Sequence, residues 1–343
     1  MLDERKKRIL EAIIDDYITT GEPVGSRTIA KKYILGLSSA TIRNEMSDLE
    51  DLGFLEQPHT SAGRIPSDKG YRYYVDQIMQ LQRPSPSEIE FIKSQLMTNI
   101  GEIENYMSQI AKVVSEITNY MAIVSTPNVK KSFIKHIQLI PVDNKRFLLI
   151  LVTSTGLVKD TLVEKPKSIH IKDFDFITNI LNQELIGLKL EDIDDNIIKD
   201  IEKKLGSNSE ILYPIIENVL KTISAADETE LLLSGAKNIF NFPEFNDIIK
   251  AKIFLHLFEQ KELLRKILNT YEINNITIRI GSENPIDDMK ECSIILSTYK
   301  IGDNITGMIG VLGPKRLRYS HTISVIDYIC DELSKILTRL FIE

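Results

Sequence analysis

The sequence is poor in cysteine. Only Cys292 and Cys330 are present, with no C-x-x-C pair and no histidine at ligand spacing beside either of them. A disulfide framework or a structural zinc site needs more cysteines, or histidines at characteristic spacings. We therefore expect no metal site, and we expect both thiols to be small core residues.

Long apolar runs are also missing. The longest uncharged stretches, residues 117–129 and 147–158, have thirteen and twelve residues, whereas a membrane helix needs about 20. The basic run at residues 5–8 is followed by Glu11, Asp15 and Asp16 instead of the apolar segment of a signal peptide. We expect a cytoplasmic protein with no membrane partner.

Motifs of catalysis are absent as well. The chain has no H-E-x-x-H, G-x-S-x-G or P-loop sequence, and its histidines are scattered. Gly307, Gly310 and Gly313 are spaced G-x-x-G-x-x-G, which differs from the dinucleotide-binding fingerprint and predicts a crowded strand and turn instead. We expect no enzyme activity and no cofactor.

Positive charge is scarce for a nucleic-acid-binding protein. The net charge is −7, and residues 1–80 hold eleven Lys and Arg against thirteen Asp and Glu. Nucleic-acid binders usually present a basic surface. Any DNA-binding function must therefore depend on where individual charges lie.

The first 80 residues nevertheless have the pattern of a winged helix-turn-helix. A first helix ends at Thr20-Gly21, and Ser26 is placed to cap a second, which runs to Tyr33. The apolar residues of the first helix recur at helical spacing: Leu10, Ile13, Ile14 and Tyr17. Residues 54–57 and 64–66 predict two short strands joined by a hairpin of small, polar and basic residues, which is typical of a wing.

The third helix, residues 39–52, carries the clearest functional signal. Ser38 or Ser39 can cap its start, and Gly53 stands at its end. Its buried stripe is Ile42, Met46, Leu49 and Leu52. Its acids all follow the N-terminal third, which keeps negative charge away from the end that would face DNA. Arginine pairs with guanine and asparagine with adenine in the major groove.

These elements predict a set of DNA contacts, with Arg64 and His59 reaching phosphate or the minor groove from the wing. The alternative, that Arg43 and Arg64 are ordinary solvated charges, is disfavoured by the order of the elements. The predicted DNA-binding residues are Arg27, Ser39, Thr41, Arg43, Asn44, Ser47, His59, Thr60 and Arg64.

Beyond residue 82, prolines and serines at 83–87 predict a linker, and residues 88–124 predict one long amphipathic helix. Strands are expected at 133–141, 145–153 and 156–163, and again at 276–281, 292–299 and 305–312. Helices are expected within 173–223 and at 246–268 and 320–341. This order predicts a sheet domain interrupted by an insertion. Lys315, Arg316 and Arg318 are interpreted as a solvated turn, with an intradomain or phosphate contact as the alternative.

Three motifs give the chain a family resemblance. Residues 21–28 (GEPVGSRT), 39–46 (SATIRNEM) and 60–66 (TSAGRIP), together with 280–285 and 307–316, resemble the HrcA family of heat-inducible transcription repressors. The resemblance implies an α+β multidomain fold with an N-terminal winged helix-turn-helix and a GAF-like α/β domain that carries an inserted, mostly helical dimerizing domain. The expected boundaries are 1–82 for the DNA-binding domain, 83–87 for the linker, 88–165 and 246–343 for the GAF-like domain, and 166–245 for the inserted domain.

The resulting functional hypothesis is a homodimeric repressor that binds double-stranded DNA at an inverted repeat. The resemblance implies that this operator is CIRCE, that it controls heat-shock (chaperone) operons, that the chaperonin GroEL supports the active form, and that heat stress releases the repressor. The alternative is a metabolite-responsive regulator that senses a ligand through its GAF-like domain.

Overall fold

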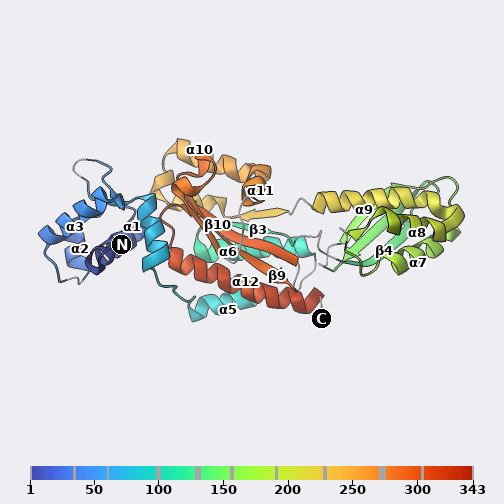
Figure 1. Ribbon diagram of the computed structural model, residues 1–343, viewed down its shortest axis with the longest axis horizontal. Coiled ribbons are helices and arrows are strands. Elements are labelled where there is room, and N and C mark those ends of the chain that lie inside the picture. Colours follow the sequence, from blue (N-terminus) through green and yellow to red (C-terminus); the bar gives the residue numbers. More distant parts are fainter. Residues whose placement is uncertain are drawn as a thin grey trace.

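The computed structural model describes residues 2–33, 36–59, 62–97, 102–127, 133–154, 158–189, 192–226, 230–269, 276–302 and 305–341. Figure 1 shows three parts along the long axis: a head formed by the first 80 residues, a central domain, and an insertion at the opposite end. No helix in these ranges is long and apolar enough to cross a membrane.

The head contains the predicted helices and wing. Its elements are α1 (Glu4–Thr20), α2 (Ser26–Lys32), α3 (Ser39–Asp51), β1 (Leu55–Glu56), β2 (Ile65–Pro66), α4 (Asp68–Tyr73) and a π-helical turn (Tyr74–Ile78). The wing strands β1 and β2 pair antiparallel. One detail differs from expectation: Gly25, not Ser26, is the N-cap of α2, and no side chain caps this helix.

The central domain is an antiparallel sheet covered on both faces. Its strand order is β7-β3-β10-β9-β8, from β3 (Met121–Ser125), β7 (Leu231–Ser234), β8 (Ile276–Ile280), β9 (Cys292–Ile301) and β10 (Ile305–Pro314). One face packs against α6 (Ile103–Thr118) and α12 (Tyr319–Phe341), and the other against α10 (Ile248–Glu259) and α11 (Lys261–Asn269). Strands from both sides of the insertion therefore form one sheet.

The three glycines of β10 lie where that sheet is most crowded. A Cβ atom on Gly310 would come within 2.4 Å of the Ile295 carbonyl oxygen, and one on Gly307 within 2.3 Å of the Tyr299 ring. Gly313 is similarly confined, because its Cβ atom would lie 2.7 Å from Leu317. The expectation of a crowded strand and turn is confirmed.

The insertion has its own sheet and core. Its elements are β4 (Ile134–Pro141), β5 (Arg146–Thr153), β6 (Val158–Glu164), α7 (Phe174–Leu185), α8 (Asp195–Leu205) and α9 (Leu212–Ala226). The strands pair in the order β4-β5-β6 and not with the central sheet, and their buried residues join those of the helices in a separate cluster. The expected boundary at 165/166 is therefore wrong for the strands, and β7, expected in the insertion, belongs to the central sheet.

Two further expectations fail between the head and the central sheet. The helix expected at 88–124 is α5 (Pro86–Leu96), then α6, then β3. Asn119, with φ 62°, ends α6, and the wholly buried residues 121–125 that follow form a strand. The linker expected at 83–87 already contains the start of α5: Ser85 forms a capping box with Glu88, and Pro86 stands at the first turn, where a missing N–H costs nothing.

Candidate DNA-binding surface

Helix α3 begins as the sequence predicts, but it ends at Asp51, and Leu52 of the predicted buried stripe is 46% exposed. The Ser38 side chain accepts a hydrogen bond from the Thr41 backbone N–H at 3.1 Å, which confirms it as the N-cap. Ile42, Met46 and Leu49 are buried against the rest of the head. The helix therefore presents a fixed outer face, because its inner face is held by the core.

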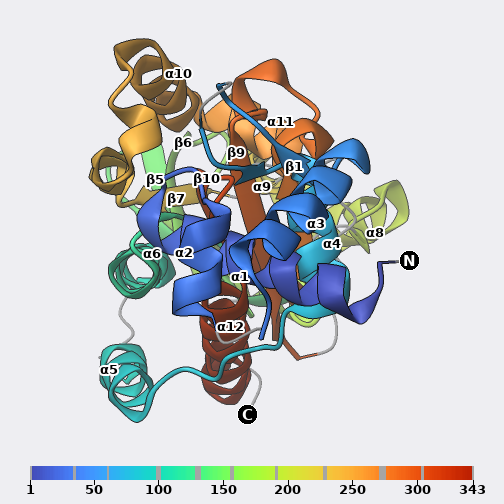
Figure 2. The same ribbon diagram turned by 90° about the vertical axis from the view of Figure 1, so that its left-hand side faces the viewer.

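The predicted base-reading side chains lie on that outer face. Arg43, Asn44 and Ser47 are exposed, whereas Ser39 and Thr41 are half-buried. The Thr41 hydroxyl lies 3.0 Å from that of Ser38, so Thr41 belongs to the capping network. Figure 2 looks onto the end of the molecule where α1, α2 and α3 lie nearest the viewer, away from the central domain.

Two acids of α3, Glu45 and Asp48, form ion pairs within the head, which sequence reasoning missed. Lys6 of α1 lies 2.8 Å from Glu45 and 3.1 Å from Asp48, and Arg5 lies 3.3 Å from Glu45. Hydrogen bonds to Glu45 and then Asp48 raise the pKa of Lys6 above its usual value. The basic run at the N-terminus therefore offsets the negative charge beside the outer face of α3.

Arg64 is placed differently from the prediction of a phosphate contact. Its Nε and Nη2 atoms lie 2.8 and 2.7 Å from one Glu50 carboxylate oxygen, and the two side chains are only 20 and 30% exposed. Arg64 thus connects the wing to the last turn of α3. His59 is exposed on the hairpin as expected, and Thr60 lies outside the described residues.

A second contact joins two of the motifs that carry the family resemblance, residues 21–28 and 60–66. Val24 and Arg64 exchange backbone hydrogen bonds, each 2.9 Å long, so the α1–α2 connection adds to the wing. Gly63 permits this close approach, because a Cβ atom there would lie 2.5 Å from the Val24 carbonyl group. Backbone cannot move aside as a flexible side chain can.

We expect Gly63→Ala to lower the free energy of unfolding by about 1–3 kcal/mol, the usual cost of overpacking. The displaced wing should weaken DNA binding as well. Denaturant unfolding, followed by titration with duplex DNA, measures both effects. Ala62→Gly is the matched control at the neighbouring position. Unchanged unfolding of Gly63→Ala would show that the wing is not held by this contact.

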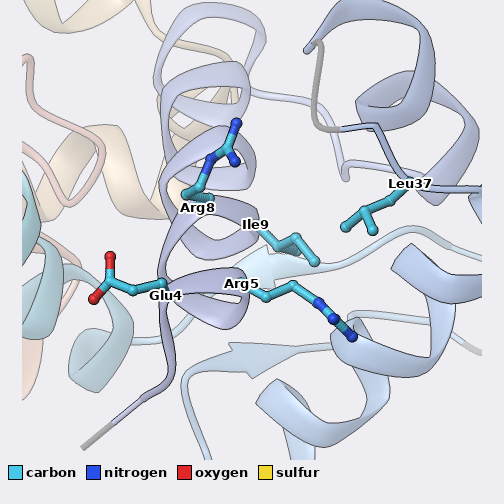
Figure 3. Close-up of a pocket in the computed structure, with 5 residues that line it drawn as sticks. All are labelled: Glu4, Arg5, Arg8, Ile9 and Leu37. Atoms are coloured by element: carbon cyan, nitrogen blue, oxygen red, sulfur yellow. The ribbon is translucent and has the colours of Figure 1, made fainter.

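Exposed cations flank the start of α3. Arg27 lies on the exposed side of α2, as does Lys31. Arg5 and Arg8 line a hollow of about 170 Å³ between α1 and Leu37, the latter two residues before α3 begins (Figure 3). This volume is smaller than a typical ligand site of about 300–1,000 Å³, so we assign no ligand to it.

The described residues contain no group of three or more histidine, cysteine or acidic side chains that could hold a metal ion. Cys292 and Cys330 are both buried, and burial raises the pKa of each thiol to about 12. Neither thiol is therefore prepared for nucleophilic chemistry near neutral pH.

Two protein-family models match the chain. Residues 1–80 match the model of the winged helix-turn-helix transcription repressor, HrcA DNA-binding, and residues 104–323 match the HrcA protein C terminal domain. The heat-inducible transcription repressor HrcA of Acetivibrio thermocellus is 44% identical over 99% of this chain and 97% of its own length. That of Clostridium botulinum strain Alaska E43 is 45% identical over 98% of both chains.

One solved structure also aligns along the whole chain. A crystal structure described as a hypothetical protein at 2.2 Å resolution has a TM-score of 0.66 and 25% identity, and the alignment covers 99% of each chain. The family is one of repressors and not of enzymes, and its match does not favour the metabolite-sensing alternative. The chain belongs to the HrcA family of heat-inducible transcription repressors, with a DNA-binding winged helix in its first 80 residues.

Proposed function

We propose that the chain acts in the cytoplasm as a homodimer whose two heads occupy the half-sites of an inverted-repeat operator, the CIRCE element of chaperone operons. The observation that carries this proposal is the outer face of α3, where exposed Arg43 and Asn44 stand beside acids already paired with Lys6. Such a face can enter the major groove without carrying unpaired negative charge at its centre.

The remaining predicted residues take supporting roles. Arg43 and Asn44 contact base edges, and Arg27, Ser47, His59 and Thr60 contact phosphates or neighbouring bases. Ser39 lies in the first turn of α3, where backbone N–H groups suit a phosphate, and Thr41 contributes through the cap. Arg64 acts indirectly by holding the wing against Glu50.

The insertion is the proposed dimerizing domain, within a central domain that we interpret as GAF-like. Helix α7 packs against one face of its sheet, and the opposite face is exposed and mixed, with His136, Gln138 and Asp160 among its apolar residues. Ile140, Leu148 and Leu162 form a row across the three strands. Ile140 is 41%, Leu162 47% and Val158 57% exposed. An exposed apolar row across all three strands favours an interface with a second copy.

We expect heat to act on the association of the two copies. A single small head neutralises few phosphates, so useful affinity requires both heads to bind together. Warming that separates or loosens the two copies would release the operator without a chemical effector. By its family resemblance, the chaperonin GroEL supports the active form of the repressor.

A footprint of the purified protein on the upstream regions of chaperone operons from its own genome tests the proposal. We expect protection of both arms of one inverted repeat, lost as the temperature rises through the range where the dimer dissociates. Protection of a single arm, or of unrelated sequences equally well, would contradict a dimeric repressor of these operons.

A further inference from the structure

The head does not hang from a linker but shares a core with the central domain. Buried residues of α1, α3 and α4 belong to the same hydrophobic cluster as those of α6, the central sheet and α12. Tyr71 of the head and Tyr319 of α12 are both fully buried, with ring centroids 5.9 Å apart. The orientation of the head is therefore set by packing, and polar contacts at its rim make that orientation specific.

The first polar contact is a two-pronged ion pair. Arg72 of α4 places Nε 2.8 Å and Nη2 2.5 Å from the two carboxylate oxygens of Glu283, and Nη2 also donates to the Ile278 carbonyl at 2.8 Å. Glu283 is held in turn by the Ile280 backbone N–H at 2.9 Å. A forked pair of this kind fixes direction as well as distance.

The second contact joins the start of α4 to the same part of the central domain. Asp68 accepts a hydrogen bond from the Ser282 backbone N–H at 2.9 Å and forms an ion pair with Lys315 at 3.1 Å. Burial would raise the pKa of Asp68, but these two donors outweigh it and lower the pKa below its usual value. Gly281 allows the approach, because a Cβ atom there would lie 2.4 Å from the Asp68 carboxylate.

The third contact satisfies a backbone carbonyl group in the last turn of α1. This helix has no basic residue in its last turn, yet Arg316 of the central domain donates to the Ile18 carbonyl at 2.9 Å. Arg316 is only 7% exposed and is held by Glu244 and by the Phe242 ring at 5.3 Å. A cation at a helix C-terminus satisfies an unpaired carbonyl and opposes the helix dipole. The expectation of a solvated turn is wrong for Arg316.

We propose that these three contacts form a latch that orients each head for the inverted repeat, with Arg72, Glu283 and Arg316 as positioning residues. The latched head keeps the outer face of α3 exposed and away from the central domain (Figure 2). Binding of the second half-site is intramolecular, so its strength depends on how narrowly the two heads are oriented. A head without these contacts keeps its own contacts with DNA, but it is correctly oriented for its half-site for a smaller fraction of the time. The inference rests on the proposed function.

The test compares the wild type, Arg72→Gln, Glu283→Gln and the double variant. Each is titrated with a duplex carrying the inverted repeat and with a duplex carrying one half-site. We expect each single variant to bind the inverted repeat about tenfold more weakly and the half-site within about twofold of wild type. The double variant should lose little more than either single variant, because both remove the same contact.

Glu332→Gln is the matched control, because it breaks a lysine–glutamate pair on α12 of the central domain (Lys335 to Glu332, 2.7 Å). It should leave both affinities unchanged. Thermal unfolding of every variant identifies any variant that fails to fold. Lys315→Met is then tested in place of that variant, with the same expected outcome. Equal losses on both duplexes, or none on either, would overturn the latch. A wild type that binds both duplexes equally well would instead contradict the proposed function.

Discussion

Leu162→Glu should leave the head folded but weaken operator binding by about 10² to 10⁴-fold, the range by which linking two binding modules raises affinity. Leu162 lies on the edge strand β6, in the exposed apolar row of the insertion, and is paired in register with Leu148 of β5. Two glutamates brought together in an apolar interface would lose hydration without gaining a partner. The dimer should therefore dissociate at concentrations where the wild type stays paired.

Sedimentation of the variant measures the dimer, and titration with the inverted repeat measures operator binding. Phe176→Glu is the matched control: Phe176 is 48% exposed on α7, the helix that covers the opposite face of the same sheet. It should remain dimeric and bind the operator normally. A Leu162→Glu protein that stays dimeric with full affinity would place the interface elsewhere.

Arg43→Ala should cost about 1–3 kcal/mol of discrimination at one base position, the worth of a good bidentate contact to guanine. Arg43 is exposed on the outer face of α3, next to Asn44 in the sequence. The loss should be confined to the operator, because a base contact contributes little to binding of unrelated DNA.

Lys31→Ala provides the contrast for that measurement. Lys31 is an exposed cation of α2, so its removal should weaken operator and scrambled duplexes alike and reduce the salt dependence of binding. Titration of both variants against both duplexes separates the two behaviours. Undiminished operator binding by Arg43→Ala would remove α3 from the recognition of bases.

The acidity of the chain gains a physical explanation from these contacts. Three of the four acids of α3, Glu45, Asp48 and Glu50, pair with Lys6 and Arg64. The head therefore presents less negative charge beside its reading face than its composition suggests. Because each pair is formed between separate elements, the same contacts also hold α1, α3 and the wing together.

Local signals explain which elements could be predicted from the sequence. Ser38 and the stripe from Ile42 to Leu49 mark α3 through cap chemistry and helical spacing, which depend only on residues a few positions apart. The strands of the insertion were located for the same reason. The strands with which they pair could not be predicted. Apolar and polar residues alternate over residues 133–163 in a way that is compatible with either sheet, and pairing is decided by contacts distant in sequence.

The roles of individual arginine side chains were the hardest part of the site to predict from the sequence. Arg64 pairs with Glu50, fourteen positions away, and Arg316 spans 298 positions to reach Ile18. Nothing within a few residues of either arginine distinguishes a buried structural contact from a surface charge. The proposed latch is likewise invisible in the sequence, because Arg72 and Glu283 meet only once the head has docked on the central domain.

The central claim, that the outer face of α3 lies in the major groove of the operator, is tested most directly by photo-crosslinking. A photoreactive residue is placed at position 44 on α3 or, as the control, at the exposed position 213 on α9 in the insertion. The account predicts crosslinks from position 44 to bases within both arms of the inverted repeat, and none from position 213. Crosslinks absent at position 44 while the protein protects the operator would contradict it.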